Sequence, residues 1–179
     1  VSFIKSLINK KTDFYSKDKL YAEGDIIEKS PLLNLYQKRI FKHIKKFGGA
    51  LLLFDYGPYK KRKIDTIQAI HKSKKCNYID YPFKSDITYH IDFDDFKEVA
   101  KEYGLHSYGP ISQQRFLYFN GINERAINLI KNSNLSNLSK GKIELGYQRL
   151  VDPLGMGRLI KCILITKNKN SFNMFRKLS

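Results

Sequence analysis

Apolar side chains recur at helical spacing after Ser30-Pro31, and this pattern predicts the first clear helix of the chain. A serine can cap the free amides of a first turn, and a proline at the first helical position loses no hydrogen bond. Gly48-Gly49 predicts the helix end, because glycine readily adopts the positive φ of a helix terminus. The expected buried stripe consists of Leu33, Tyr36, Ile40, Ile44 and Phe47.

A second helix is predicted over residues 91–103. Asp92 is its expected cap, and Ile91 and Phe96 have the spacing of a hydrophobic staple. Gly104 marks the expected end. The buried stripe should consist of Phe96, Val99, Ala100 and Tyr103.

Shorter helical segments are expected elsewhere. Residues 123–132 and 142–150 favour helices, and the Asn- and Ser-rich segment 133–141 between them favours a loop. Residues 65–71 are expected to form a short helix with Asp65 as its cap. Residues 113–119 suit either a short strand or a helical turn.

Uninterrupted apolar runs predict the strands. Residues 50–54 lack the alternation of a half-exposed strand, so we expect a parallel strand that is buried on both faces. Residues 105–111 and 159–166 predict two more strands, and residues 24–28 a short strand or an extended lead-in. Residues 73–84 are polar and irregular. The resulting order predicts an α/β fold that forms half of a doubly wound sheet, with a helical insertion before the last strand.

Composition supports one folded domain. The chain has 179 residues, of which 42% are hydrophobic and 28% charged. Two cysteines without a CxxC pair argue against a disulfide scaffold and for a reducing compartment. No apolar run is long enough to span a bilayer, and residues 1–11 are too short and basic for a signal peptide. We therefore expect no membrane partner and a cytoplasmic location in a bacterium.

The net charge of +16 raises nucleic acid as a partner. The charge is spread along the whole chain, without the interleaved aromatic residues of a stacking platform. Abundant lysine, asparagine and isoleucine fit a lysine-coated surface equally well. The pattern therefore favours a solvated surface over a nucleic-acid site, and a basic binding module is kept as an alternative.

Two chemical motifs are weak when judged by spacing alone. Gly155-Met156-Gly157 is the only GxG, but it precedes the predicted strand 159–166, whereas a nucleotide loop must follow a strand and open a helix. We interpret it as a turn. A metal site is not favoured, because no tight ligand pair such as HExxH occurs. The polar residues that prompt the question are Asp55, Asp65, His71, Asp86, His90 and Asp92.

Seven stretches, in order and near-family spacing from about Gly24 to Thr166, carry a family resemblance. They are residues 24–31 (GDIIEKSP), 48–57 (GGALLLFDYG), 65–69 (DTIQA), 86–93 (DITYHIDF), 109–113 (GPISQ), 116–122 (FLYFNGI) and 153–161 (PLGMGRLIK). The chain thereby resembles the MidA family of S-adenosylmethionine-dependent methyltransferases, which includes a mitochondrial protein needed for assembly of respiratory complex I. One departure is Ile64, which stands where the family usually has a glycine.

The resemblance implies the C-terminal half of a class I, Rossmann-like methyltransferase that transfers a methyl group to protein arginine. It also implies that the family's N-terminal half, with the Gly-rich loop for S-adenosylmethionine, is not in this chain. Residues 1–23 would then join the missing half, 24–167 would form the C-terminal part of the domain, and 168–179 would be a basic tail. The cofactor-binding residues stay unknown.

By matching position, Asp55, Asp65, Asp86 and His90 are the catalytic candidates that the resemblance implies. The substrate-binding candidates are Glu28, Tyr56, Gly57 and Gln113. The implied partners are an arginine-bearing protein, such as a complex I subunit, and an N-terminal half present as a separate chain. The alternatives are a non-catalytic remnant and the basic binding module.

Overall fold

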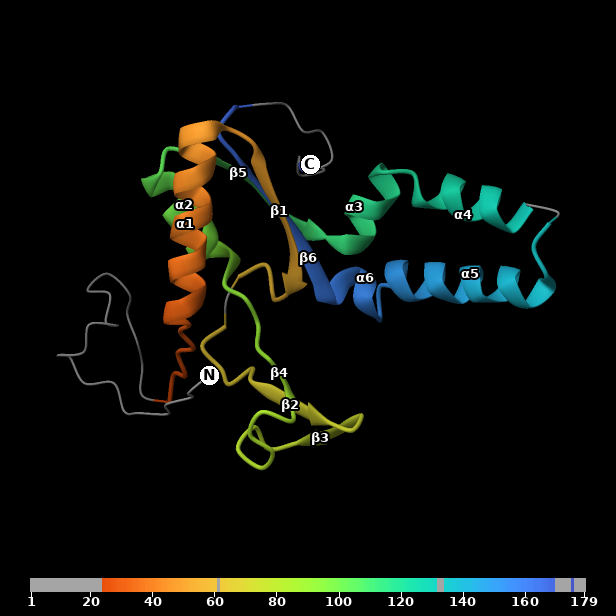
Figure 1. The fold of residues 1–179 in the computed structure, drawn as a ribbon, viewed down its shortest axis with the longest axis horizontal. Coiled ribbons are helices and arrows are strands. Elements are labelled where there is room, and N and C mark those ends of the chain that lie inside the picture. The colour runs from red at the N-terminus through yellow and green to blue at the C-terminus, as the bar shows by residue number, and fades with distance from the viewer. Residues whose placement is uncertain (1–23, 61, 132–133, 170–174, 176–179) are drawn as a thin grey trace.

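Two small β-sheets organise the chain, and the computed structural model describes them over residues 24–60, 62–131, 134–169 and 175. The expectations for residues 1–23 and for most of the tail 168–179 lie outside these described residues. Figure 1 shows α1 and α2 packed beside the larger sheet, the smaller sheet at one end, and a pair of helices that projects to one side. None of the helices described is long and apolar enough to cross a membrane.

The larger sheet has the strand order β1-β6-β5. It consists of β1 (Ala50–Tyr56), β6 (Ile160–Thr166) and β5 (His106–Ser112). β6 lies in the centre and runs antiparallel to both neighbours, so β1 and β5 point the same way. All seven residues of β6 are buried, because side chains cover both of its faces. The two strands predicted from the later apolar runs are therefore confirmed.

Two helices cover one face of this sheet (Figure 1). They are α1 (Pro31–Phe47) and α2 (Phe93–Glu102). The Ser30 side chain accepts a hydrogen bond from the Leu33 amide at 3.2 Å, and Asp92 accepts from two amides of its first turn. Both predicted caps are thus confirmed. The shared core includes Phe41, Ile44, Phe93, Phe96, Val99, Ala100, Ile163 and Ile165.

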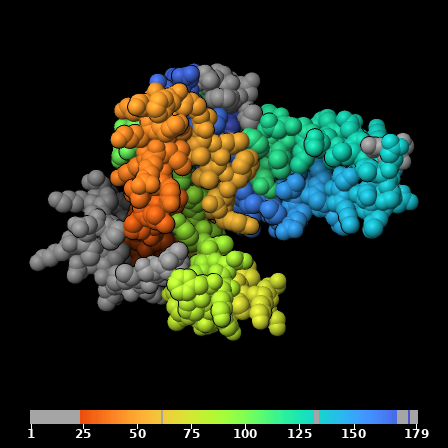
Figure 2. Space-filling model, in the orientation of Figure 1, coloured from red at the N-terminus to blue at the C-terminus, as the bar shows by residue number. Residues whose placement is uncertain are grey.

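The opposite face of the sheet packs against the start of the helical insertion. Cys162 and Leu164 of β6 contact Ile111, Phe116 and Phe175 there. The insertion comprises α3 (Gln113–Phe119), α4 (Ile122–Lys131), α5 (Asn137–Val151) and α6 (Met156–Leu159). Its position before the last strand was predicted, and Figure 2 shows how far α4 and α5 extend from the body. The expected loop 133–141 is shorter than predicted, because Ser136 caps α5.

The smaller sheet replaces a predicted helix. Its order is β3-β2-β4, from β3 (Lys74–Cys76), β2 (Gln68–His71) and β4 (Asp86–Thr88). The helix expected over residues 65–71 is wrong, because the backbone of β2 pairs with strands on both sides. Asp65 accepts instead from the amide of Ile67 at 3.1 Å, an Asx turn that leads into the strand. The segment 73–84, predicted to be irregular, contributes β3 and the turns that follow it.

The predicted buried stripe of α1 is partly wrong. Ile44 is buried, but Tyr36, Ile40 and Phe47 are exposed. The buried positions are Gln37, Phe41 and Ile44. They lie on a neighbouring stripe that also has helical spacing, and packing against α2 and β6 selects it over the more apolar one. A polar residue, Gln37, is therefore buried between α1 and the rest of the core.

The prediction for β1 is also wrong in two respects. The strand pairs antiparallel with β6, and among the described residues only this one edge is paired. Its side chains alternate between partly buried and exposed, and Leu52 and Phe54 are 46% and 37% exposed. Leu51 and Leu53 pack one face of β1 against the helix-side core, and the other face is left largely uncovered, so burial alternates along the strand. Residues 25–30 contain no strand and form the extended lead-in to α1.

Candidate functional site

Both core helices begin at the carboxyl end of β1. α1 precedes β1 and α2 precedes the parallel-pointing β5, so the two N-termini lie together at this end of the sheet (Figure 1). The Ile91 amide donates to the Tyr56 carbonyl at 2.9 Å and joins the start of α2 to the last residue of β1. Ligands of open α/β sheets bind beyond the carboxyl ends of strands, so functional side chains are expected here.

A buried hydrogen-bond network joins three polar residues at this end. The Glu28 carboxylate accepts from the Thr66 amide at 2.6 Å and from the Thr66 hydroxyl at 2.7 Å. The Thr66 hydroxyl in turn accepts from the His90 amide at 2.9 Å. Glu28 therefore holds the lead-in of α1 against the segments before β2 and α2. Two predicted site residues, Glu28 and His90, are brought together by a threonine that was not predicted.

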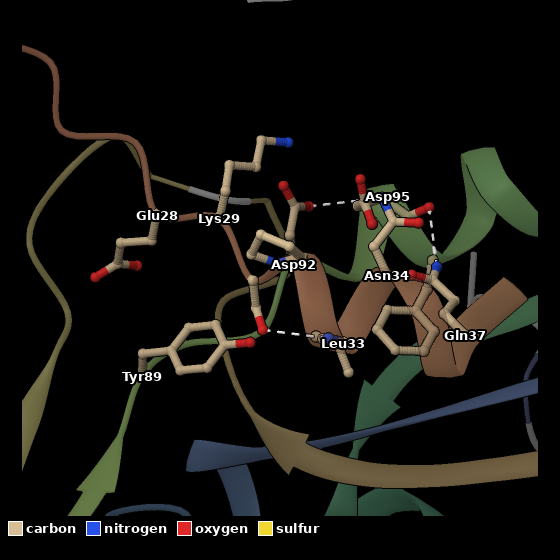
Figure 3. A pocket seen from close by; sticks show the side chains of 11 residues that line it. Glu28, Lys29, Leu33, Asn34, Gln37, Tyr89, Asp92 and Asp95 are labelled. Atoms are coloured by element: carbon tan, nitrogen blue, oxygen red, sulfur yellow. Dashed lines mark hydrogen bonds between the residues drawn. The ribbon is translucent and has the colours of Figure 1, made fainter. Parts of the chain in front are cut away.

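Tyr89 lies between the carboxylates of this region. Burial raises the pKa of the Tyr89 phenol, and the charges of Asp55, Glu28 and Asp95 raise it further against a hydrogen bond with Ser30. Figure 3 shows the phenol directed toward the N-terminal end of α1. The raised pKa keeps this phenol neutral near several carboxylates at neutral pH.

Asp55 is the carboxylate at the end of β1 itself. It is half-buried, and its Oδ1 accepts from the Tyr56 amide at 2.7 Å. Burial raises the pKa of the Asp55 carboxyl above its usual range, and the hydrogen bond from Tyr56 opposes this effect. Raised carboxyl pKa values in a cleft indicate a group suited to exchanging protons or binding cations.

The two residues after Asp55 have different surroundings. The Tyr56 side chain is partly exposed, and its backbone carbonyl accepts the hydrogen bond from the Ile91 amide. Gly57 is buried, and a Cβ there would lie 2.7 Å from the Ile91 carbonyl oxygen and 3.0 Å from the Phe93 ring. Only glycine lets the chain pass this close to the start of α2.

A small hollow of about 90 Å³ opens between the N-terminal turns of α1 and α2 (Figure 3). Its lining includes three carboxylates, Glu28, Asp92 and Asp95, and one lysine, Lys29. The remaining lining residues are Ser30, Pro31, Leu33, Asn34, Gln37, Tyr89 and Phe96. In a chain whose net charge is +16, this hollow is locally negative.

Three predicted site residues lie apart from this region or serve other contacts. Asp65 is exposed in its turn, and Asp86 is exposed on β4 of the smaller sheet. The buried Gln113 side chain donates to the Leu150 carbonyl at 2.9 Å and thereby joins α3 to the end of α5. The described residues contain no group of three or more acidic, histidine or cysteine side chains arranged to hold a metal ion.

Sequence reasoning missed Gln37, Tyr89 and Asp95, which the fold brings to the hollow. Gln37 carried a usable signal, because it lies four residues from both Leu33 and Phe41 and interrupts an otherwise apolar helical stripe. Tyr89 and Asp95 carried no comparable signal, since their proximity depends on how two distant segments pack.

Curated relatives match most of the chain, but only part of their own length. The mitochondrial protein arginine methyltransferase NDUFAF7 of Xenopus laevis is 27% identical over 152 residues, which cover 85% of this chain and 34% of the relative. Its Homo sapiens counterpart is 30% identical over 133 residues, covering 74% and 30%. The chain therefore spans about a third of the length of these relatives.

Two solved structures from Burkholderia thailandensis share the fold. An uncharacterized protein aligns with a TM-score of 0.65 at 24% identity, covering 77% of this chain and 39% of the other. A likely methyl transferase bound to S-adenosyl-homocysteine aligns with a TM-score of 0.62 at 22% identity, covering 77% and 38%.

A family model provides the decisive match. Residues 3–111, more than half of the chain, match the model described as a putative S-adenosyl-L-methionine-dependent methyltransferase. The matched range contains Glu28, Asp55, His90 and the whole hollow. The chain therefore belongs to this family of putative S-adenosyl-L-methionine-dependent methyltransferases, as its resemblance to the MidA family predicts.

Proposed function

We propose that this chain forms the acceptor side of a methyltransferase whose substrate is an arginine side chain of a protein. The observation that carries the proposal is the group of carboxylates around the carboxyl end of β1, with Asp55 at the strand end. Two relatives named as protein arginine methyltransferases support this choice of substrate. The resemblance extends the proposal to a respiratory complex I subunit as the protein that carries the arginine.

The chemistry of the acceptor requires carboxylates of this kind. A guanidinium is a planar cation with five N–H donors, and carboxylates orient it through charge-assisted hydrogen bonds. It must also lose one proton when one of its nitrogens is alkylated. Asp55 suits both tasks, because a carboxyl whose pKa is raised by burial accepts a proton more readily. Orientation in a partly water-excluded site then lowers the entropic part of the barrier.

The one GxG motif among the described residues lacks the context of a cofactor loop. Gly155-Met156-Gly157 opens α6, but it follows α5 and not a strand. A Cβ on Gly157 would lie 2.5 Å from the Val151 carbonyl oxygen, so this glycine permits close packing on α5 and forms no ligand cradle. We propose that the cofactor loop lies in sequence beyond these 179 residues or in a partner chain, and we derive no step through the cofactor.

The test uses the chain as it is purified from its native cells, together with the polypeptides bound to it. A C-terminal affinity tag isolates the chain together with any polypeptide that it is joined to or paired with. Incubation with S-adenosylmethionine carrying a deuterated methyl group, followed by mass spectrometry of arginine peptides, should place the label on an arginine nitrogen. Labelling of lysine or of nucleic acid, or no labelling, would contradict the proposal.

A calorimetric titration of the isolated 179-residue chain with S-adenosylmethionine tests the placement of the cofactor site. We expect no measurable heat of binding. Binding at micromolar strength would show that these residues contain the site after all.

A further inference from the structure

We propose that the hollow between α1 and α2 binds the guanidinium group of the acceptor arginine, an assignment that rests on the proposed function. Figure 3 shows the hollow with the side chains that line it. Asp55 is not one of them, but its charge acts on the Tyr89 phenol, which is; the assignment therefore places one edge of the guanidinium in the hollow and leaves a nitrogen for Asp55. Three independent features of its lining point to a ligand that is both cationic and rich in hydrogen-bond donors. They concern Gln37, the acidic residues of the first turn of α2, and the shortage of donors in the wall.

Gln37 supplies a buried acceptor without a partner. Its side chain is only 2% exposed, and its Oε1 has no hydrogen-bond partner in the part of the chain that is described. Its Nε2 donates to the Asp95 carbonyl at 3.5 Å, which is near the outer limit for a hydrogen bond. Buried acceptors without partners are rare in native structures, and a bound donor is one of their standard explanations.

The first turn of α2 adds negative charge beside this acceptor. Asp92 uses Oδ1 to cap the helix through the Asp94 and Asp95 amides, so its second oxygen is left for a ligand. The Asp95 carboxylate has no hydrogen bond or ion pair within the described residues. Asp92 and Asp95 both line the hollow, and Figure 3 shows the Glu28 carboxylate turned away from them. Glu28 is instead bound to Thr66.

Among the described lining residues, few donors reach these acceptors. Lys29 is the only cation among them and forms no ion pair with Asp92 or Asp95, and no hydrogen bond joins the Ser30 hydroxyl or the Asn34 amide to the Gln37 Oε1 or to these carboxylates. The Tyr89 phenol is already engaged with Ser30. Two carboxylates in one partly buried wall give it a negative potential that favours a cation. The wall is therefore complementary to a cation and not to an anion, although two helix N-termini meet here.

Size and geometry favour guanidinium over ammonium. One water requires roughly 10–15 Å³ of such space, so about 90 Å³ accommodates a small planar group of several atoms. A guanidinium presents donors along two edges in one plane and can bridge an amide oxygen and a carboxylate together. An ammonium concentrates its charge at one point and reaches fewer of these acceptors at once.

The experiment is a titration of the full chain with N-acetyl-arginine amide, followed by amide NMR shifts without any methyl donor. Shifts should concentrate at the starts of α1 and α2. Asp95→Asn should weaken binding about tenfold or more, because a charge-assisted hydrogen bond is lost. The neighbouring Asp94→Asn is the matched control, since Asp94 pairs with Lys97 and lies outside the lining, and it should change affinity less than about twofold.

Gln37 gives a second test that separates binding from folding. Gln37→Leu should raise the melting temperature of the ligand-free chain, because it removes a buried acceptor without a partner, and should weaken arginine binding. Gln37→Glu should strengthen binding. Unchanged affinity in Gln37→Leu, or equal binding of N-acetyl-lysine amide, would overturn the assignment of a guanidinium pocket.

The two proposals fail in distinguishable ways. Arginine binding with the expected variant pattern, but no methyl transfer by the isolated assembly, would remove the proposed reaction and leave the guanidinium site. Methyl transfer whose KM for an arginine peptide is unaffected by Asp95→Asn and Gln37→Leu would remove this pocket and leave the reaction.

Discussion

Glu28 and Thr66 lie 38 residues apart in the sequence, yet the Glu28 carboxylate accepts from both the amide and the hydroxyl of Thr66. The amide contact is 2.6 Å long and both residues are buried. Because the same hydroxyl accepts from the His90 amide, one threonine connects three segments at the carboxyl end of β1. The positions of the proposed site residues therefore depend on a side chain that is itself not a candidate for chemistry.

Thr66→Val should destabilise the fold. Valine keeps the shape, but it removes one donor to Glu28 and leaves the His90 amide without its acceptor. Each loss of this kind costs about 1–3 kcal/mol of the free energy of unfolding. Urea denaturation checks the size of the effect, with Thr88→Val on the exposed side of β4 as the control. Equal stability of the two variants would show that the network contributes little.

Asp55→Asn should stabilise the chain at neutral pH. Burial raises the pKa of Asp55, so the folded state disfavours the ionised form, and stability falls as pH rises from the usual value of 3.8 through the folded pKa. Asparagine removes that charge and can still accept from the Tyr56 amide. The melting temperature of the variant should exceed that of the parent chain near pH 7, and the gap should close in acid.

Asp86→Asn serves as the control for this pH dependence, because Asp86 is exposed on β4. It should leave the melting temperature nearly unchanged across the same pH range. A loss of stability in Asp55→Asn at neutral pH would show that the carboxylate has a favourable contact in the fold that its burial does not reveal.

The predictions that rest on local sequence patterns were the most reliable ones. Ser30 and Asp92 were identified as caps because a capping side chain reaches amides only two or three residues ahead. The helical insertion and the strand β6 followed from the same local patterns. Among the site residues, Asp55 was expected just after the apolar run 50–54 and lies next to the last residue of β1, Glu28 lies in the lead-in to α1, and the roles assigned to both stay predictions.

The sequence predictions failed where the burial of a residue depends on how several segments pack together. Residues 50–54 and 160–166 are both apolar runs, but β6 is buried on both faces because it lies in the centre, while β1 has one edge unpaired among the described residues. No local pattern distinguishes these positions. Gln37 was overlooked for a related reason, because the more apolar stripe of α1 was expected to face the core.

Gly57→Ala should destabilise the fold and disturb the site together. The added Cβ would meet the Ile91 carbonyl oxygen at 2.7 Å, and backbone cannot move aside as a flexible side chain can. Overpacking of this kind costs about 1–3 kcal/mol. Gly146→Ala is the matched control, since Gly146 lies within α5 with open space around its Cβ position and should gain about 0.5–1 kcal/mol. Equal effects from both substitutions would refute the packing argument.

The two cysteines should differ sharply in reactivity. Cys162 is fully buried on β6, and burial raises the pKa of its thiol to about 12, so almost no thiolate forms at neutral pH. Cys76 is partly exposed, with Ser85 as its neighbour. A thiol reagent should therefore modify Cys76 rapidly in the folded chain and Cys162 only after denaturation. Rapid modification of both thiols would indicate that the core around β6 opens readily.

The sharpest test of the proposed reaction is Asp55→Asn in the assembly that contains the cofactor site. Asp55 ends β1 on the side where open α/β sheets bind ligands, and a carboxylate there orients a guanidinium and takes up the proton that it releases. Asparagine keeps the size and one acceptor oxygen but loses the charge. Charge-assisted hydrogen bonds contribute about 1.5–3 kcal/mol, so turnover should fall about tenfold to a hundredfold.

Cofactor affinity, measured by calorimetry on the same preparation, should change far less. Asp94→Asn, which alters an exposed carboxylate paired with Lys97, should retain turnover. If Asp55 only shapes the turn before Gly57, the substitution will leave turnover intact, which would remove Asp55 from the proposed site.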